Sequence, residues 1–243
     1  MKYKIIQTCD ATSDYIKLFN LSSMVNKEYC KKWNYDYDSF IGLKKGYHSW
    51  HAVFNRIYML NECIEENIYD WIIYLDVDAF IVDFNISFDD IIKDEQNKDK
   101  ALLLMGFGEK HNNMCINTGV LFINIKHTKT KYLINNWKTT LELVISDEAL
   151  QASKEPWSIK MNNVIIDDQV LLSMIFFLLD ELKLTDTMIY RYLNNQGILN
   201  NSFIQQVMRP NKGIDGTFVS YRVQLMRANI EKLIQRYDLN IKI

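Results

Sequence analysis

The sequence contains little that would divide the chain into separate parts. Its 243 residues include only two prolines and eight glycines, and neither a low-complexity linker nor an internal repeat interrupts them. Hydrophobic residues make up 48% of the chain and aromatic residues 13%, so it can bury a large core, which excludes wholesale disorder. This length lies near the upper end of what one α/β domain occupies, so a single domain is expected.

Long apolar runs and paired cysteines are also missing. The longest apolar stretch, 170–179, contains Ser173 and is far shorter than the roughly 18 residues that a membrane span needs. The first residues, 1–6, enter a strand-like pattern at once, which leaves no room for a signal peptide and predicts a cytoplasmic location. The four cysteines are scattered, without a CxxC pair or zinc-type histidine spacing, which indicates buried, reduced thiols.

Charge of neither sign is in large excess. The formal net charge is -2, which excludes a nucleic-acid-binding protein that relies on bulk electrostatics. The last stretch, 207–243, is more basic than the rest, with seven basic and three acidic residues. Two interpretations stay open for it, a surface that contacts an anionic ligand or a solvated helix face.

Strand-like and helix-like segments alternate along the chain. Strands are expected at 4–8, 35–40, 71–75, 80–82, 101–105, 119–125, 188–192 and 218–222. Helices are expected at 13–33, 48–67, 129–144, 168–182 and 224–237. This alternation predicts an α/β fold with an open, mostly parallel sheet and helices on both faces. In such sheets ligands bind beyond the carboxyl ends of the strands.

Two aspartates follow the most apolar of the expected strands. Residues 71–75 form a nearly continuous apolar run that ends in Asp76-Val77-Asp78, which indicates a buried central strand. Side chains alternate along an extended chain, so Asp76 and Asp78 point to the same side, about 7 Å apart. Two such carboxylates favour a shared hard cation, Mn²⁺ or Mg²⁺, whose open positions a nucleotide diphosphate can fill. An ordinary strand end, where acidic residues cap the next turn, is the alternative.

Four segments accompany these aspartates: 28–37, the helix 50–60 with Arg56, 69–81 with the DxD motif, and 117–124, which begins Asn117-Thr118-Gly119 and is followed downstream by Asp167-Asp168-Gln169. Together they resemble the GT-A fold glycosyltransferases, and most of all the retaining α-galactosyl-, α-mannosyl- and xyloglucan α-xylosyltransferases. The resemblance implies one GT-A domain over 1–243. Its nucleotide-sugar-binding part would be 1–115, and its acceptor-side part, with the basic C-terminal segment, 116–243.

For the nucleotide, the resemblance implies contacts at the end of the first strand and on the elements beside it. Thr8, Cys9 and Asp10 would border the base and ribose, and Tyr37 would lie near the base. Arg56 would contact the nucleotide or the diphosphate. The alternatives are that Arg56 is a surface residue and that Tyr37 belongs to the core.

For the sugar, the resemblance implies that Asp76 and Asp78 hold the metal and the sugar nucleotide. Asn117, Thr118 and Gly119 would line the sugar and acceptor pocket. Asp167, Asp168 and Gln169, at a helix start, would lie near the anomeric carbon. Alternatively, Asn117 satisfies a turn, and Asp167 or Asp168 is an ordinary helix N-cap.

The sequence departs from the family at the third metal ligand. Family members usually supply a histidine from a late H-F/x-x-G segment, whereas no histidine follows His127 in this chain. In the corresponding stretch, 211–221, Asp215 is the candidate replacement, with Asn211 a weaker one. Lys212 and its basic neighbours Arg209 and Arg222 are candidates for contacting the diphosphate. None of the four histidines is predicted to be a ligand, although His111 precedes Asn117 on the acceptor side.

The expected reaction moves a hexosyl or pentosyl group from a nucleoside diphosphate sugar, UDP rather than GDP, to a hydroxyl of a glycan or other acceptor. No general base stands out, so retention with front-face attack is expected, whereas in an inverting enzyme Asp168 would be the base. Two alternatives remain. One is a non-catalytic sugar-nucleotide-binding relic of the same fold. The other is a DxD phosphohydrolase, which is disfavoured because Phe80 occupies the place of its Thr or Val.

Overall fold

The described part of the chain is built around one mixed sheet. A computed structural model describes residues 1–93, 99–106, 116–155, 158–161, 164–178, 187–189, 202–207 and 218–243. Within these residues a six-stranded sheet has the order β2-β1-β3-β6-β5-β9. Its strands are β1 (Tyr3–Cys9), β2 (Asp36–Ile41), β3 (Trp71–Leu75), β5 (Leu102–Gly106), β6 (Ile116–Asn124) and β9 (Thr187–Ile189).

One reversed strand decides what lies at the carboxyl end of β3. β1 pairs in parallel with β2 and β3, and β5 in parallel with β9, whereas β6 runs antiparallel to both β3 and β5. The predicted open, mostly parallel sheet is therefore confirmed, with β6 as its exception. Because Leu75 lies opposite Val120, the start of β6 meets the end of β3. Residues 117–119 are thereby brought beside the DxD motif.

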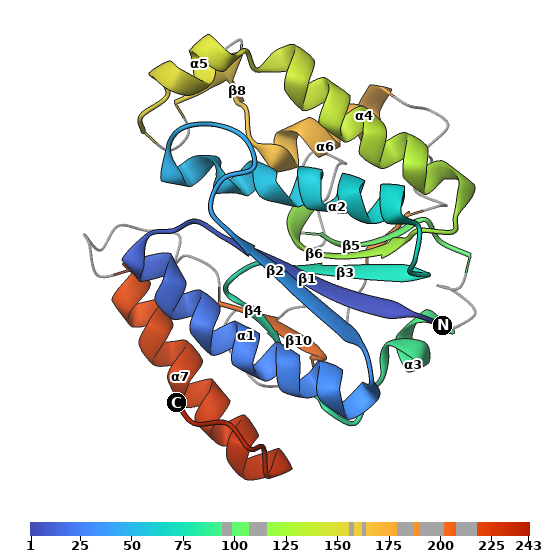
Figure 1. The fold of residues 1–243 in the computed structure, drawn as a ribbon, viewed down its shortest axis with the longest axis vertical. Helices are drawn as coiled ribbons and strands as arrows, with labels where there is room; N and C mark the ends of the chain where they lie inside the picture. The colour runs from blue at the N-terminus through green and yellow to red at the C-terminus, as the bar shows by residue number, and fades with distance from the viewer. Residues whose placement is uncertain are drawn as a thin grey trace.

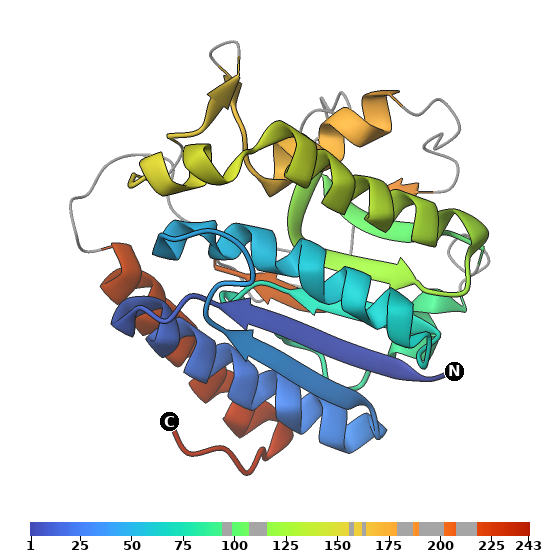
Figure 2. The same cartoon turned by 45° about the horizontal axis from the view of Figure 1, so that its top comes forward.

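Helices cover both faces of the sheet, as Figures 1 and 2 show. One face carries α1 (Ser13–Trp33), α7 (Phe218–Tyr237) and the short α3 (Phe88–Ile92). The other carries α2 (Asn55–Glu66), α4 (Thr128–Val144) and α6 (Asp168–Leu178). Side chains of β3 alternate between the two cores, because successive residues of a strand point to opposite faces. Ile73 packs on the α1 side, whereas Ile72 packs on the α2 side.

A second, two-stranded sheet completes the region around the DxD motif. β4 (Ala79–Ile81) follows the motif and pairs antiparallel with β10 (Ile204–Gln206), with Gln206 opposite Ala79. The sequence pattern did not predict β10. It also missed α3, α5 (Asp147–Ala152) and the hairpin of β7 (Lys160–Met161) and β8 (Val164–Ile165). These elements are short, so they have too few residues to show a period.

Two predicted elements differ in the structure. The strand predicted at 218–222 is wrong, because α7 already begins at Phe218. Its aromatic and β-branched residues favour a strand, but Arg222, Met226, Ile230 and Leu233 are all buried, and this helical spacing decides the conformation. The helix predicted at 48–67 is divided into a 3₁₀ helix, η1 (Ser49–Phe54), followed by α2.

The structure bears on two expectations from the sequence, the absence of a membrane-spanning helix and the burial of the cysteines. Among the helices of the described residues, none is both long and apolar enough to cross a membrane. Cys9, Cys30 and Cys63 are buried and not bonded to one another, in agreement with the prediction of buried thiols, while Cys115 lies outside the described residues.

Trp137 provides a test of how α4 and α6 are held together. Its fully buried indole donates from Nε1 to the backbone carbonyl of Asp168 at 3.1 Å. Trp137→Phe removes this bond and leaves a small cavity, so we expect a loss of about 1–3 kcal/mol in the free energy of unfolding, measured with urea. The matched control is Trp33→Phe, since the Trp33 indole nitrogen has no hydrogen-bond partner among the described residues. Equal losses in the two variants would contradict this account.

Candidate functional site

A cavity opens at the carboxyl ends of β1 and β3. Its volume is about 360 Å³. It is lined from six parts of the chain: the end of β1, the start of α1, η1 with the start of α2, the end of β3 with the DxD turn, the start of α6, and α7. Candidate residues from the sequence that line it are Thr8, Cys9, Asp10, Arg56, Asp76, Asp78, Asp168, Gln169 and Arg222. The structure thus brings together side chains up to 214 positions apart, from Thr8 to Arg222.

Arg56 is a buried cation at the centre of this cavity wall. Its Nη2 donates to Asp76 Oδ1 at 2.8 Å, and its Nη1 donates to Thr118 Oγ1 at 2.7 Å. Its Nε lies 3.3 Å from Asp168 Oδ2, and its guanidinium carbon lies 4.7 Å from the centre of the Tyr74 ring. Burial lowers the pKa of Arg56, but Asp168 and Asp76 outweigh this effect, so its pKa lies above the ordinary value. Arg56 is therefore a fixed positive charge and not a surface residue.

Asp76 lines the cavity, and both of its carboxylate oxygens accept hydrogen bonds. Asp76 Oδ1 also accepts from the Tyr74 hydroxyl at 2.9 Å, and Thr8 Oγ1 lies 3.1 Å from the same hydroxyl. Burial raises the pKa of Tyr74 well above 10, so the hydroxyl stays protonated and donates. The backbone N–H of Asp76 donates to the carbonyl of Gly119 at 2.8 Å, which ties the motif to β6. With its side chain 26% exposed, Asp76 is the accessible member of the pair.

Asp78 lies deeper and pairs with a cation from α7. Arg222 donates from Nη2 to Asp78 Oδ2, and from Nε to the carbonyl of Val207 at 2.8 Å. Burial raises the pKa of Asp78, although Arg222 favours the ionised form. The side-chain amide of Gln206 lies between the two aspartates, with Nε2 3.1 Å from Asp78 Oδ1 and 3.4 Å from Asp76 Oδ2. Asp76 and Asp78 thus converge on one point. They do so from a turn, closed by the Ala79 N–H donating to the Asp76 carbonyl at 2.9 Å, and not from the extended segment that the alternation argument assumed.

Gly119 is required by the close approach of β6 to the aspartates. A Cβ at this position would lie 2.3 Å from Gln206 Nε2 and 2.7 Å from Asp76 Oδ2, closer than atoms can approach. The side chain of Asn117, two residues before Gly119, contacts both Gly119 and Gln206. Its Oδ1 accepts from the Gly119 N–H at 2.7 Å, and its Nδ2 donates to Gln206 Oε1 at 2.9 Å. The turn alternative for Asn117 is wrong, because Asn117 and Gly119 lie within β6; Asn117 instead orients the amide beside the DxD motif.

The two aspartates at the start of α6 have different roles. Asp168 is buried, accepts from Thr118 Oγ1 and pairs with Arg56. Burial raises the pKa of Asp168 to about 6, against the opposing effect of Arg56. Asp167 accepts from the backbone N–H of Val170 at 2.8 Å, three residues on, which is the N-cap arrangement. The N-cap alternative therefore describes Asp167, while Asp168 belongs to the Arg56 cluster.

The residues predicted to border the nucleotide base and ribose make fewer contacts with the cluster of Arg56, Asp76 and Asp168. Asp10 Oδ1 accepts from the Thr12 N–H at 2.9 Å, which shapes the turn into α1. Burial raises the pKa of Cys9 to about 12, so its thiol is neutral and unreactive. Tyr37 is half-buried and does not line the cavity; it donates to Gln7 Oε1 at 2.9 Å. Gln7 in turn donates to the carbonyl of Asp76 at 3.1 Å, so Tyr37 reaches the motif only through Gln7.

Sequence reasoning missed Gln206 and Tyr74 and named others that lie outside the described residues. Lys212, Asp215 and His111 belong to that second group. Within the described residues there is no cluster of three His, Cys, Asp or Glu side chains that would hold a metal ion. The available signal for Gln206 was a polar pair, Gln205-Gln206, inside an otherwise apolar run, but its partners are about 130 positions away and no local pattern identifies them.

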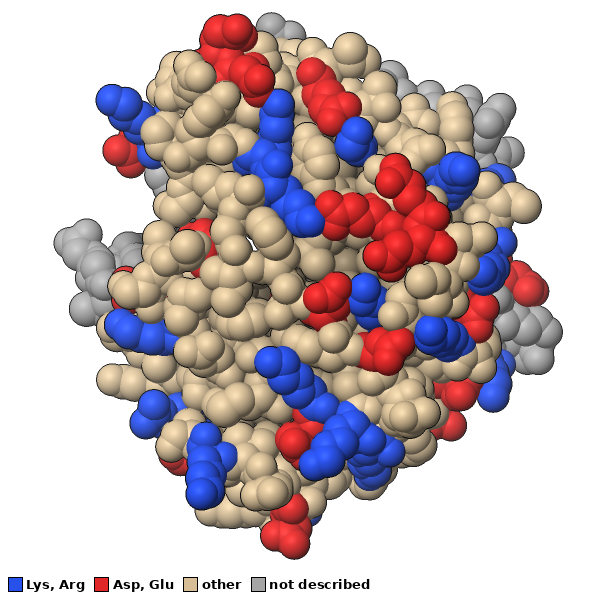
Figure 3. Space-filling view, in the orientation of Figure 1, with Lys and Arg blue, Asp and Glu red and all other residues tan. Residues whose placement is uncertain are grey.

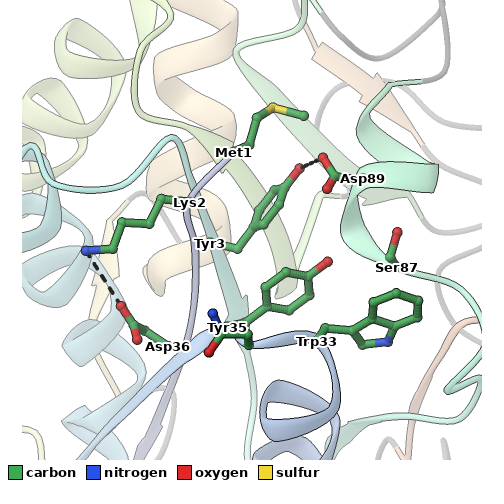
Figure 4. A pocket seen from close by; sticks show the side chains of 9 residues that line it. Met1, Lys2, Tyr3, Trp33, Tyr35, Asp36, Ser87 and Asp89 are labelled. Atoms are coloured by element: carbon green, nitrogen blue, oxygen red, sulfur yellow. Dashed lines mark hydrogen bonds and ion pairs between the residues drawn. The ribbon is translucent and has the colours of Figure 1, made fainter.

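A second cavity, of about 430 Å³, lies at the opposite end of β1 (Figure 4). Its charged side chains are paired: the Tyr3 hydroxyl donates to Asp89 at 2.6 Å, and Lys2 lies 3.9 Å from Asp36. The seven residues of β1 separate the two cavities by about 20 Å, at about 3.3 Å per residue. Convergent charged side chains distinguish the cavity at the carboxyl ends, and we take that one as the candidate site.

Charged side chains of both signs lie on the face shown in Figure 3. Acidic and basic side chains gather there in separate groups. Arg227, Lys232 and Arg236 of α7 are exposed, whereas Arg222 is 2% exposed. The solvated-face interpretation of the basic C-terminal stretch therefore describes the three exposed residues, whereas Arg222 pairs with Asp78; contact with an anionic ligand stays a prediction.

Comparisons with known proteins bear on the fold. No protein-family profile and no curated protein matches the sequence. The structure is similar to that of a glycosyltransferase involved in the glycosylation of the major capsid of PBCV-1, with a TM-score of 0.62 and 14% identity over 94% of this chain and 100% of that one. It is also similar to the apo form of the glycosyltransferase GlyE of Streptococcus pneumoniae TIGR4, with a TM-score of 0.55 and 14% identity over 97% of this chain. The chain spans 64% of the length of GlyE. The chain has the GT-A fold, as predicted.

Removing the Arg56 charge tests whether the cluster depends on it. Arg56→Gln leaves Asp76 and Asp168 without their shared cation, and we expect the free energy of unfolding to fall by about 3–5 kcal/mol in urea titrations. Lys45→Gln is the control, because Lys45 forms a partly exposed pair with Asp147 at 2.5 Å. Such surface pairs contribute about 0–1 kcal/mol. Similar losses in both variants would show that Arg56 does not organise the site.

The raised pKa of Asp168 predicts a pH dependence of stability. A carboxyl whose pKa is higher in the folded than in the unfolded protein contributes stability that is full below about pH 4 and is lost as the pH rises through about 6. We expect the stability of the wild type relative to Asp168→Asn to fall by about 2–3 kcal/mol between pH 4 and pH 7. Urea unfolding of both proteins across this range measures it. A difference that does not vary with pH would contradict the assignment.

Proposed function

We propose that this chain transfers a sugar from a nucleoside diphosphate sugar to a hydroxyl group of an acceptor. One observation carries the proposal: in a GT-A fold, Asp76 and Asp78 converge on a single point at the carboxyl end of β3, within a cavity of about 360 Å³. Ligands of open α/β sheets bind at this edge. The glycosyltransferase neighbours in fold support the same reaction class.

The oxygens of the two aspartates suit a divalent cation, Mn²⁺ or Mg²⁺, which we propose as the cofactor. Asp76 Oδ1 and Asp78 Oδ2 are taken by Arg56 and Arg222. Asp76 Oδ2 and Asp78 Oδ1 face each other across the Gln206 amide nitrogen, at 3.4 and 3.1 Å. We call these two the inner oxygens; as carboxylate oxygens they are ligands that hard cations prefer. Such a cation would stabilise the charge of the departing diphosphate. Asp215 as a further ligand stays a prediction.

The surrounding side chains would act mainly by holding charge in place. Arg56 and Tyr74 fix Asp76, and Arg222 fixes Asp78, so neither carboxylate needs to reorganise when a donor binds. Asp168 is buried and held by Thr118 and Arg56, which suits orientation of Arg56 better than proton transfer from an acceptor. This supports retention over inversion. The donor base, with UDP preferred over GDP, and the acceptor, a glycan or other hydroxyl compound, belong to the same proposal.

A panel of donors tests binding and separates an enzyme from a non-catalytic relic. UDP-, GDP- and dTDP-sugars are compared with and without Mn²⁺ by thermal unfolding. A donor at 100 times its dissociation constant stabilises the native protein by about 2.7 kcal/mol, so at least one donor raises the unfolding temperature. Release of free sugar from that donor identifies an enzyme, whereas binding without release identifies the relic. Absence of a shift with every donor would refute the proposal.

Asp76→Asn tests the DxD motif with the least damage to the fold. Asp78→Asn leaves the buried Arg222 without its partner, so it is expected to unfold more easily, whereas after Asp76→Asn the cation Arg56 keeps Asp168. We expect donor turnover in Asp76→Asn to fall about 100-fold or more, because one of the two carboxylates that would hold the cation is lost. The control is Asp147→Asn on the surface. Unchanged turnover in Asp76→Asn would exclude the motif from the reaction.

A further inference from the structure

One neutral side chain occupies the point on which the DxD carboxylates converge. Gln206 is 3% exposed and lies on β10, opposite Ala79, immediately beside the motif. The carbonyl of Asp78 accepts from the N–H of Val207 at 2.9 Å, which fixes this register. As a result, Gln206 Nε2 lies within 3.4 Å of both inner oxygens. The amide hydrogens satisfy the two oxygens that a cation would use.

The orientation of this amide is set by its neighbours. Gln206 Oε1 accepts from Asn117 Nδ2 at 2.9 Å, and Asn117 Oδ1 accepts from the backbone N–H of Gly119 at 2.7 Å. A backbone N–H can only donate, so Asn117 must keep its oxygen toward Gly119 and its nitrogen toward Gln206. Turning the Gln206 amide would set two donors against each other. Gln206 therefore presents hydrogens, and not its oxygen, to the aspartates.

A donor at this point competes with a cation for the same oxygens. The outer oxygens are already occupied by Arg56 and Arg222, and the described residues offer no third acidic or histidine ligand. To bind, a cation must break the two amide contacts and lose water ligands. In exchange, the described residues offer it two carboxylate oxygens. A bound diphosphate adds further oxygen ligands and negative charge, which shifts the balance toward the cation.

We propose that Gln206 acts as a built-in competitor that keeps the cation affinity of Asp76 and Asp78 low until a nucleoside diphosphate is bound. The proposal rests on the proposed function, because it assumes that the diphosphate enters this cavity. It makes Gln206 a positioning residue that acts through the two aspartates. Cation and diphosphate then bind with positive coupling, and by reciprocity each raises the affinity for the other.

The test measures Mn²⁺ binding to the full chain from the electron paramagnetic resonance signal of free Mn²⁺, without any assay of turnover. For the wild type, we expect Mn²⁺ to bind at least about tenfold more tightly with saturating UDP than without it. Gln206→Met removes the amide hydrogens at similar volume, so Mn²⁺ alone should bind at least about tenfold more tightly than to the wild type. Gln205→Met is the matched control, since the Gln205 side chain points to Asn229 of α7, and it should leave Mn²⁺ binding unchanged.

A second variant keeps the proposal testable if Gln206→Met does not fold. In Asn117→Asp one carboxylate oxygen still accepts from the Gly119 N–H. The other oxygen replaces Nδ2 and can only accept from Gln206, so the Gln206 amide must turn its nitrogen to residue 117 and its Oε1 toward the aspartates. This converts the competitor into a third oxygen ligand, and Mn²⁺ should again bind at least about tenfold more tightly without UDP.

The possible results separate this proposal from the proposed function. If UDP with Mn²⁺ binds in calorimetry but Gln206→Met and Asn117→Asp bind Mn²⁺ no more tightly than the wild type, the competitor role is wrong and the donor site stands. Weaker Mn²⁺ binding by Gln206→Met would show that the amide supports the site, which also overturns the proposal. If UDP binds under no condition, the proposed function fails, and the proposal that rests on it fails as well.

Discussion

The cavity at the carboxyl ends of the strands depends on the burial of Arg56 with charges that match it. The guanidinium joins α2 to the end of β3 through Asp76, to the start of β6 through Thr118, and to α6 through Asp168. A buried cation of this kind is costly unless each of its donors is paired, and replacing such a cluster with apolar residues is often neutral or stabilising. Packing alone therefore does not explain its presence. The proposed role of the cavity in binding a sugar donor would explain why charges lie together here.

Close contacts with two neighbouring strands fix the backbone around the DxD motif. β6 runs against its neighbours and delivers Gly119 to a place where even a methyl group would collide with Asp76 and Gln206. β10 approaches from the other side and pairs with β4, the strand that leaves the motif. The two aspartates thus lie between two backbone segments that meet them from different sheets. Their positions follow from strand register rather than from flexible side-chain choice.

Much of the fold was predictable because its signals are local. The apolar run before Asp76 predicted the buried β3, and the alternation of strands with helices predicted the layered sheet. Local preference gave the wrong conformation from Phe218 onward. The residues there favour a strand, but they are helical because α7 buries Arg222 and Met226 on one side. Local preference is a weak constraint where packing against another element decides the conformation.

The site was predictable only as far as it lies on recognisable segments. Asp76, Asp78, Arg56 and Asp168 each belong to a motif or a helix start, and the structure places them around one cavity. Gln206 has no such marker. Its place in the site is set by partners far away in the sequence, Asn117 and the two aspartates, and not by its own neighbours in sequence. Glutamine is also chemically ambiguous, since either end of its amide can face a carboxylate or a cation.

That ambiguity is resolved by a chain of donors that starts at the backbone. The N–H of Gly119 fixes Asn117, and Asn117 fixes Gln206, so the direction of a bond in β6 determines whether the DxD carboxylates face a hydrogen or an oxygen. Arg222 and Arg56 meanwhile hold the outer oxygens, which leaves the inner pair as the one place where the charge of the motif is opposed by a neutral group. In the proposed function, a cation and a diphosphate together would supply the charge and the ligands that the amide lacks. The proposed coupling, in which the two bind together more favourably than either one alone, follows from this arrangement.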